Sequence, residues 1–313
     1  MSESLFSQRK QCPTCLSEKF SPLYECNFAA EPVRLYLEKA YGEAESFDIE
    51  KLKKTNYSLL QCQDCNLIFQ EFIPSPALML LLYENWIDAE KSLENRKRYG
   101  IAYYSLYSQD IAQILAYLGK PPADTKVLDF GMGWGHWALM SKAFGCEVYG
   151  AEISQRRIEY AKRNGISNIR WEDIPSEKFD FINTDQVFEH LADPQDTLKY
   201  LRKSLKPDSL IKISVPNSFG IRYRLKHMDW SAPKGSFKSL NPVAPLEHIN
   251  CFYRQSILDL ANSVDLVEIK IPISLQYKYT TVWDHPKRAI RNILIPIYRN
   301  ILGLQNYYLF RPR

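Results

Sequence analysis

The segment VLDFGMGWGHWALM, residues 127–140, limits the fold of this chain more than any other stretch. It begins as an apolar run typical of a buried strand and reaches Asp129 before a helical pattern starts. Three glycines lie between the strand and the helix: Gly131, Gly133 and Gly135. Glycine has no Cβ and tolerates positive φ, so this turn lets the backbone approach a ligand closely. A second strand, CEVYGAEI, ends near Glu152. This order of strand, glycine loop, helix, strand and acid predicts a nucleoside-binding βαβ unit.

The spacing of the glycines indicates which nucleoside the unit binds. A dinucleotide site has the pattern GxGxxG and rests a pyrophosphate on its helix N-terminus. Here the pattern is GxGxG, and Asp129 precedes it. A carboxylate there repels pyrophosphate and suits a cationic α-amino group, while Glu152 can accept hydrogen bonds from a ribose diol. The series DxGxGxG followed by an acid resembles the class I S-adenosylmethionine-dependent methyltransferases; a merely structural tight turn is the alternative.

The resemblance continues along the chain to about residue 313. It includes EHLADPQDTLKYLRKSLKPDSLIKISVPN and PLEHINCFYRQSILDLANSVDLVEI, with one departure where Asp265 replaces a usual glycine. It implies an α/β fold with a Rossmann-like, seven-stranded sheet, a final antiparallel strand, and S-adenosyl-L-methionine as cofactor. The residues that it assigns to cofactor binding are Asp129, Phe130, Gly131, Gly133, Gly135, Glu152, Ile153, Asp173, Ile174 and Asp185.

Four of the seven cysteines form two CxxC pairs near the N-terminus. Cys12 and Cys15 lie in QCPTC, and Cys62 and Cys65 lie in QCQDC. Each pair can turn two thiolates toward one ion, and two pairs complete a tetrahedral Zn²⁺ site. The alternatives are a redox-active pair or unrelated thiols, which two matched pairs disfavour. We therefore expect a small zinc-binding domain stabilised by its metal.

Sequence patterns divide the chain into three parts. Residues 1–75 are the expected zinc-binding domain, residues 76–122 a helical linker or cap, and residues 123–313 the cofactor-binding domain. Insertions into the last part are expected at residues 218–248 and 284–303. Helices that precede the first strand often cover the cofactor in this fold.

Aromatic residues of the cap and the stretch 284–302 each have two interpretations. Tyr83, Trp86 and Tyr103 could reach the cofactor, but core packing is the simpler explanation.

The basic amphipathic stretch 284–302 could contact a membrane surface, or pack on the sheet or in a dimer. No apolar run approaches the roughly 20 residues of a membrane span, and the N-terminus lacks a signal-peptide pattern. We expect a cytoplasmic protein.

Methyl transfer to a hydroxyl or a carbon acid requires removal of a proton. His190 is the first candidate base because it follows the fourth expected strand, where ligands bind in open α/β sheets. Glu189 precedes it. A zinc-bearing group of sugar methyltransferases has a similar Glu-His pair, and this resemblance implies that His190 acts as the base here. His248 is the second candidate, and a structural histidine is the alternative for each.

The expected substrate is a sugar, a nucleotide sugar or a related small metabolite, as in surface-glycan synthesis. Basic residues that could hold its phosphate lie in the insertion: Arg222, Arg224, Lys226, Lys234 and Lys238. An RNA methyltransferase and a non-catalytic cofactor-binding scaffold are the alternatives. Nucleic acid is disfavoured because the net charge is only +4 and the Asn/Asp-Pro-Pro-aromatic motif of base-amine methyltransferases is absent. The sequence leaves the oligomeric state open.

Overall fold

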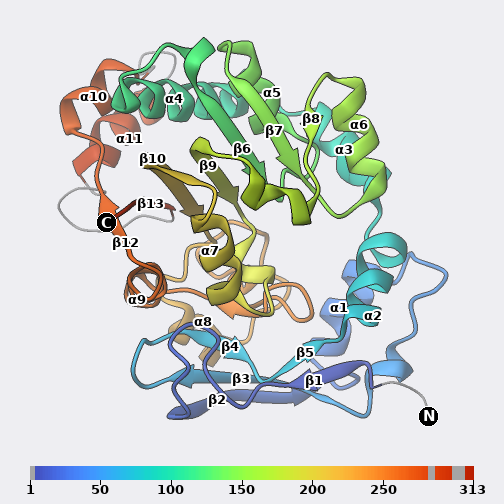
Figure 1. Ribbon diagram of the computed structural model, residues 1–313. Helices are drawn as coiled ribbons and strands as arrows, with labels where there is room; N and C mark the ends of the chain where they lie inside the picture. The colour runs from blue at the N-terminus through green and yellow to red at the C-terminus, as the bar shows by residue number, and fades with distance from the viewer. Residues whose placement is uncertain (1–3, 281–285, 298–306) are drawn as a thin grey trace. The chain divides into compact units, whose positions relative to one another are not determined.

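The computed structural model describes residues 4–280, 286–297 and 307–313 (Figure 1). The chain forms two compact units, and it passes between them several times. Unit 1 consists of residues 1–92, 188–197 and 215–263, and unit 2 consists of residues 93–187, 198–214 and 264–313.

Unit 2 is built on a seven-stranded sheet, in the order β12-β13-β10-β9-β6-β7-β8. The strands are β6 (Lys126–Phe130), β7 (Glu147–Ala151), β8 (Ser167–Asn168), β9 (Phe179–Asp185), β10 (Leu205–Ser214), β12 (Leu266–Ile269) and β13 (Tyr307–Pro312). Strands β8, β7, β6, β9 and β10 pair in parallel, and β13 is antiparallel to both β10 and β12. The predicted seven-stranded α/β sheet with an antiparallel last strand is confirmed.

The helices of unit 2 are α4 (Ile101–Leu118), α5 (His136–Ala143), α6 (Gln155–Arg163), α10 (Ile273–Lys278) and α11 (Pro286–Ile297). Helices α3 (Ala89–Lys97) and α7 (Pro194–Arg202) each begin in unit 1 and end in unit 2. Buried apolar residues recur on one side of α4 and α5, whereas α3 has no buried residue. Helix α4 lies beside α5 and α10 (Figure 1). It ends at Gly119, whose positive φ of 65° lets its N–H bond to the carbonyl of Leu115. Three strictly buried members of the core of unit 2 are Val127, Phe181 and Leu210.

Two short 3₁₀ turns precede strands of unit 2. Turn η3 (Pro122–Asp124) connects α4 to β6, and η4 (Trp171–Ser176) connects β8 to β9. The sequence SNIRWEDI predicts a third strand that reaches about Asp173, but β8 ends at Asn168 and η4 follows. Pro175 lies within η4.

Unit 1 contains two antiparallel sheets, one of the order β1-β5 and one of the order β11-β4-β3-β2. Their strands are β1 (Phe6–Gln8), β2 (Phe20–Asn27), β3 (Asn56–Cys62), β4 (Ile68–Gln70), β5 (Phe72–Pro74) and β11 (Asn250–Cys251). The other elements are α1 (Val33–Tyr41), η1 (Ile49–Leu52), α2 (Pro76–Leu81), η2 (Leu82–Trp86), η5 (Phe188–His190), α8 (Ile221–His227), η6 (Asn241–Val243) and α9 (Arg254–Asn262). Buried side chains from both ends of the sequence share its core, among them Phe28, Tyr57, Trp230 and Leu246.

The compact units group the chain differently from the linear parts expected from the sequence. Strand β11, from the second half of the chain, pairs with β4 and so completes the N-terminal sheet. The segment 188–197 that carries Glu189 and His190 also belongs to unit 1. Where the chain would divide into independently folding domains stays a prediction.

Candidate functional site

The glycine loop between β6 and α5 adopts the conformation that its sequence predicts. Gly131, Gly133 and Gly135 all have positive φ, from 55° to 72°. The N–H groups of Gly131 and Met132 both donate to the carbonyl of Ala151, which ties the loop to the end of β7. A Cβ at Gly131 would meet Val187 Cγ2 at 2.6 Å, whereas a Cβ at Gly133 would meet nothing within 4 Å. The loop thus needs glycine and leaves open space beside Gly133.

Asp129 is almost fully buried at the carboxyl end of β6, with 3% of its surface exposed. Asn183 Nδ2 donates to its Oδ1 at 2.8 Å, and Asn183 Oδ1 is itself a buried acceptor with no hydrogen-bond partner. Burial raises the pKa of Asp129 to about 7. A cationic group that approached this carboxylate would favour its charged form.

Glu152 follows the end of β7 and binds the glycine loop. Gly133 N–H donates to its Oε2 at 2.9 Å, and Ile153 and Ser154 N–H groups donate to its Oε1 at 2.9 and 3.1 Å. Two carboxylate oxygens offer about four acceptor positions, so these bonds leave room for about one more. The carboxylate therefore lies beside the open space at Gly133 and can still accept from a ribose hydroxyl. The donor set and the open loop fit the nucleoside end of S-adenosyl-L-methionine.

The residues expected around the adenine have mixed surroundings. Asp173 is partly exposed and accepts from Arg170 Nε at 2.8 Å, while Ile174 is fully buried. Ile153 is 84% exposed, and the ring of Phe130 lies 5.5 Å from that of Trp171. An adenine contact from Ile174 would need its side chain to move, so this assignment stays a prediction.

Asp185 ends β9 and has ionisable neighbours that sequence analysis missed. Burial and, next, the charge of Asp185 raise the pKa of Tyr107. Tyr107 Oη lies 2.6 Å from Tyr103 Oη, which accepts from Arg96 Nη1 at 2.8 Å. The charge of Asp185 also contributes to raising the pKa of Lys212, a buried lysine. Two signals could have indicated this group: tyrosines four residues apart on one helix, and a lone lysine in the apolar strand LIKISV.

Lys212 is held by a second carboxylate from α4. Its Nζ lies 2.5 Å from Asp110 Oδ2, and Trp137 Nε1 donates to the same oxygen at 3.3 Å. Burial works against the charge of Lys212, but the carboxylates of Asp110 and Asp185 outweigh it and raise the pKa of the lysine. A buried ion pair of this kind fixes α4 against β10.

The three residues expected to act in catalysis come together within unit 1. One ligand-type atom from each of Glu189, His190 and His248 lies within 4.8 Å of the others. His190 Nε2 is 3.8 Å from Glu189 Oε1, and the two imidazole rings are 4.8 Å apart between centroids, edge to face. Glu189 has none of its surface exposed. Donors of this kind can also bind a divalent cation.

Backbone carbonyls orient both imidazoles. His190 Nδ1 lies 2.8 Å from the carbonyl oxygen of Glu247, and His248 Nδ1 bonds to the carbonyl of Asn241. A carbonyl can only accept, so each Nδ1 carries the proton and donates it. Tyr83 Oη lies 3.3 Å from His190 Nδ1, so the cap aromatic Tyr83 does reach this group. Burial, followed by the charge of His190, lowers the pKa of His248.

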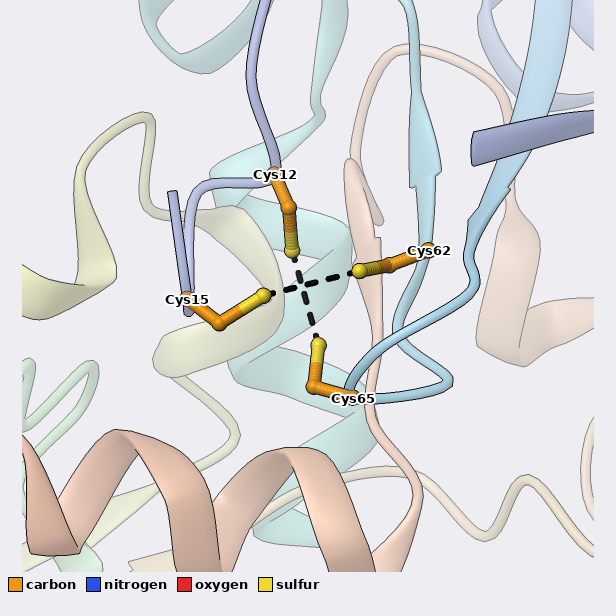
Figure 2. A group of neighbouring side chains, drawn as sticks. All are labelled: Cys12, Cys15, Cys62 and Cys65. Carbon is orange, nitrogen blue, oxygen red and sulfur yellow. Dashed lines mark hydrogen bonds between the residues drawn. The ribbon is translucent and has the colours of Figure 1, made fainter. Parts of the chain in front are cut away.

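The four cysteines of the two CxxC pairs surround one point in unit 1 (Figure 2). The Sγ atoms of Cys12 and Cys65 are 3.5 Å apart, as are those of Cys15 and Cys62. In a tetrahedral zinc site with bonds of about 2.3 Å the sulfurs stand about 3.8 Å apart. A hydrogen bond from Cys65 lowers the pKa of Cys12, which favours the thiolate form that a metal ion binds. The geometry and the donor set fit Zn²⁺.

Comparison with known proteins identifies the family. Residues 102–269, more than half of the chain, match the family model described as "Methyltransferase domain". The chain belongs to this methyltransferase family. The matched residues include the glycine loop, Glu152, Asp185, the Glu189–His190 pair and His248.

The methyltransferase domain is similar to proteins with different named substrates. Over 146 residues it is 28% identical to the ubiquinone biosynthesis O-methyltransferase of Haemophilus ducreyi. The matched region covers 39% of this chain and 60% of that protein. Over 156 residues it is 27% identical to the tRNA 5-carboxymethoxyuridine methyltransferase of Escherichia coli K12, covering 44% and 59%. The chain thus spans about 60% of the length of these curated relatives.

Solved methyltransferase structures match the chain more loosely. The plantazolicin methyltransferase BpumL in complex with SAH is 14% identical and has a TM-score of 0.46, with 76% of this chain and 91% of that chain covered. The putative sarcosine dimethylglycine methyltransferase from Galdieria sulphuraria is 19% identical, with a TM-score of 0.41 and coverages of 69% and 89%.

The described part of the methyltransferase chain contains no helix with the length and apolarity that a membrane crossing demands. Within the expected amphipathic stretch, α11 has four exposed apolar side chains: Ile290, Ile293, Leu294 and Ile297. Residues 284, 285 and 298–302 of that stretch lie outside the described residues. Peripheral membrane contact through α11 stays a prediction.

Proposed function

We propose that this protein transfers a methyl group from S-adenosyl-L-methionine to an oxygen or a carbon acid of a sugar, a nucleotide sugar or a related small metabolite. The observation that supports methyl transfer is the glycine loop of a methyltransferase-family domain, open at Gly133 and bound to Glu152. The Glu189, His190 and His248 group supports an acceptor that must lose a proton.

The chain's own residues have distinct parts in the proposed reaction. S-adenosyl-L-methionine, when bound, supplies an electrophilic methyl group. Asp129 attracts the cationic amino group, and Glu152 accepts from a ribose hydroxyl. Because Nδ1 of His190 donates to the carbonyl of Glu247, Nε2 is the atom that takes the acceptor's proton. The Glu189 carboxylate, 3.8 Å from Nε2, stabilises the imidazolium that forms.

The basic insertion supports an acceptor that carries phosphate. Arg222, Lys226, Lys234 and Lys238 are all exposed in it. Arg224, the fifth cation of the insertion, is instead buried and donates to the backbone carbonyls of residues 217, 219 and 239. Four exposed cations remain to bind an anionic group.

RNA is the second candidate substrate because one relative is named as a tRNA methyltransferase. The same insertion exposes three aromatic side chains on which bases could stack: Phe219, Tyr223 and Phe237. The small net charge remains the argument against it.

We also propose that Cys12, Cys15, Cys62 and Cys65 bind one structural Zn²⁺. The two Sγ separations of 3.5 Å and the burial of three of the four thiols support a closed, four-coordinate site. A closed thiolate site leaves no open position for substrate, so its role would be to hold the N-terminal segments together.

The fate of a methyl label tests the proposed function. The protein is incubated with methyl-labelled S-adenosylmethionine and a fractionated cell extract, with Glu152→Ala as the control for cofactor binding. Label in small anionic metabolites or glycolipid is expected. Label in nuclease-sensitive material would favour RNA as the substrate. No label, despite cofactor binding measured by calorimetry, would contradict the proposed methyl transfer and favour a non-catalytic cofactor-binding scaffold.

A further inference from the structure

Two segments of unit 1 carry the three candidate catalytic side chains. The first is the turn 188–192, which contains Glu189 and His190, and the second is the segment 241–250, which contains His248. We call them the first and the second histidine segment. They are far apart in sequence, and the helical structure in each is a single short 3₁₀ turn, η5 in the first and η6 in the second. The distance between the two imidazoles therefore depends on contacts that fasten each segment.

Arg9 fastens both histidine segments with one guanidinium group. Its Nη2 donates to the carbonyls of Leu191 at 3.2 Å and Ala192 at 2.8 Å in the first segment. Its Nη1 donates to the carbonyl of Ile249 at 3.1 Å and to Asn250 Oδ1 at 2.8 Å in the second. A planar guanidinium directs these bonds in a fixed fork, which a lysine ammonium cannot reproduce.

Asn250 completes the connection from the opposite side. Its side chain is fully buried, and its Nδ2 donates to the carbonyls of Phe188 at 3.0 Å and Leu191 at 2.7 Å. The carbonyl of Leu191 thus accepts from both Arg9 and Asn250. Four carbonyl contacts therefore hold the first segment on either side of Glu189 and His190, and the side chains that make them are bound to each other.

The four-cysteine cluster lies next to the segments that supply these donors. Cys12 comes three residues after Arg9, and Cys65 comes just before β4. Strand β4 pairs with β11, where Phe69 lies opposite Asn250. At the end of β4, Gln70 Nε2 donates to the carbonyls of Ala244 and His248, each at 3.1 Å. Each cysteine pair is thus joined through a few residues to a donor that holds a histidine segment.

We propose that Arg9 and Asn250 are positioning residues, which hold the Glu189–His190 turn in register with His248, and that the four-cysteine cluster fixes Arg9 and β4 for this purpose. The N-terminal part of the chain then serves the chemistry of the histidines. The catalytic consequence rests on the proposed function, but the effect on the histidines themselves does not.

The tautomer of His190 reports on this arrangement without any substrate. The carbonyl of Glu247 holds the proton on Nδ1 of His190 in the intact protein. A neutral imidazole in water favours the proton on Nε2 instead. If the first segment loosens, the ¹⁵N resonances of His190 move toward the Nε2–H pattern. Two-bond ¹H–¹⁵N spectra of ¹⁵N-histidine-labelled protein, assigned with His190→Gln and His248→Gln, measure this change.

Two variants test the proposal against one control. Arg9→Lys keeps the charge but loses the fork, and Asn250→Asp keeps the shape but loses both donors to Phe188 and Leu191. Arg34→Lys is the control, because Arg34 belongs to the same unit and, among the described residues, its side chain pairs with Glu31 and Glu38, which lie within four positions of it in the sequence. Chelation of the metal from the wild-type protein is a third, independent perturbation.

Both variants and chelation are expected to shift the His190 resonances, while Arg34→Lys leaves them unchanged. Once an acceptor is known, kcat should fall by about tenfold or more, since a misplacement of about 1 Å can cost on the order of 100-fold. Affinity for S-adenosylhomocysteine, measured by calorimetry, should stay within about twofold of wild type, because the residues proposed to bind the cofactor are not among the side-chain partners of Arg9 or Asn250.

Unchanged His190 and His248 resonances in folded Arg9→Lys and Asn250→Asp proteins would overturn the proposal. Circular dichroism establishes that each variant is folded, and Asn250→Asp serves if Arg9→Lys does not fold. Shifted resonances with unchanged kcat would leave the positioning role intact and contradict His190 as the base, so failure of the two proposals can be told apart.

Discussion

At the residue scale, Asp129 shows how position alone sets a charge. The sequence indicates an acid before the glycine loop, but only its burial at the carboxyl end of β6 raises its pKa to about 7. An ordinary aspartate in the unfolded chain ionises near pH 4. The folded protein therefore holds a proton on Asp129 over a range where the unfolded chain has released it.

Asp129→Asn is expected to make the stability of the protein less sensitive to a rise in pH from about 4 to 7. Because the folded pKa is raised, the unfolded state binds fewer protons between about pH 4 and 7, so Asp129 makes stability fall as pH rises through that window. Each pKa unit corresponds to about 1.4 kcal/mol. Urea unfolding at pH 5 and pH 8, without cofactor, should show a smaller loss at pH 8 for Asp129→Asn. An equal loss in both proteins would refute the raised pKa.

His190→Ala is expected to lower kcat by about 10²-fold or more, the usual contribution of a positioned base. Its affinity for S-adenosylhomocysteine should not change, since His190 is proposed to act on the methyl acceptor and not to bind the cofactor. Single-turnover rates with the identified acceptor, alongside calorimetry, measure the two effects. Full turnover in this variant would remove His190 as the base.

At the element scale, short connections carry most of the function. The glycine loop joins β6 to α5, the turn η5 follows β9, and the two cysteine pairs flank β2 and β3 in the sequence. Each depends on only a few residues to keep its shape, so a single substitution should be enough to disrupt it.

Cys62→Ser is expected to remove the metal and destabilise the N-terminal strands. Three thiolates and a hydroxyl bind Zn²⁺ more weakly than four thiolates, and metal-binding free energy is also folding free energy here. Elemental analysis should give about one zinc per wild-type chain, a number that follows from four thiolates around one ion. Cys26→Ser is the control, because Cys26 lies outside the cluster. A folded, zinc-free wild-type protein would refute the site.

At the scale of the whole molecule, two cores are assembled from interleaved stretches of one chain. The core of unit 1 combines residues 6–86 with residues 221–251, whereas the core of unit 2 starts at Ile111 and includes Leu309. The buried residues of each of these two clusters belong to a single unit, so we expect a ligand of one unit to stabilise that unit first.

Calorimetric scans of the full chain should show this separation. S-adenosylhomocysteine at 100 times its Kd adds about 2.7 kcal/mol to the state that binds it, and should raise the transition of unit 2. A zinc chelator should lower the transition of unit 1 and leave the other unchanged. A single transition that both reagents shift together would show that the two units unfold as one.

Much of the candidate site could be predicted because its signals are local. The glycines of residues 131–135 follow a strand directly, and each CxxC pair spans one turn. Arg9 carried no such signal, since its side chain donates to residues that lie far from it in the sequence. The third strand was predicted too long because the apolar pattern of its sequence does not show where the turn η4, which contains Pro175, begins.

The sequence by itself determined the family, the α/β sheet and the identity of the four clustered thiols, because these depend on spacing within short segments. Only the tertiary structure decided that Arg9 and Asn250 hold both histidine segments. Hydrogen bonds between residues about 60 to 240 positions apart leave no periodic trace in a sequence, since either partner alone is an ordinary polar residue.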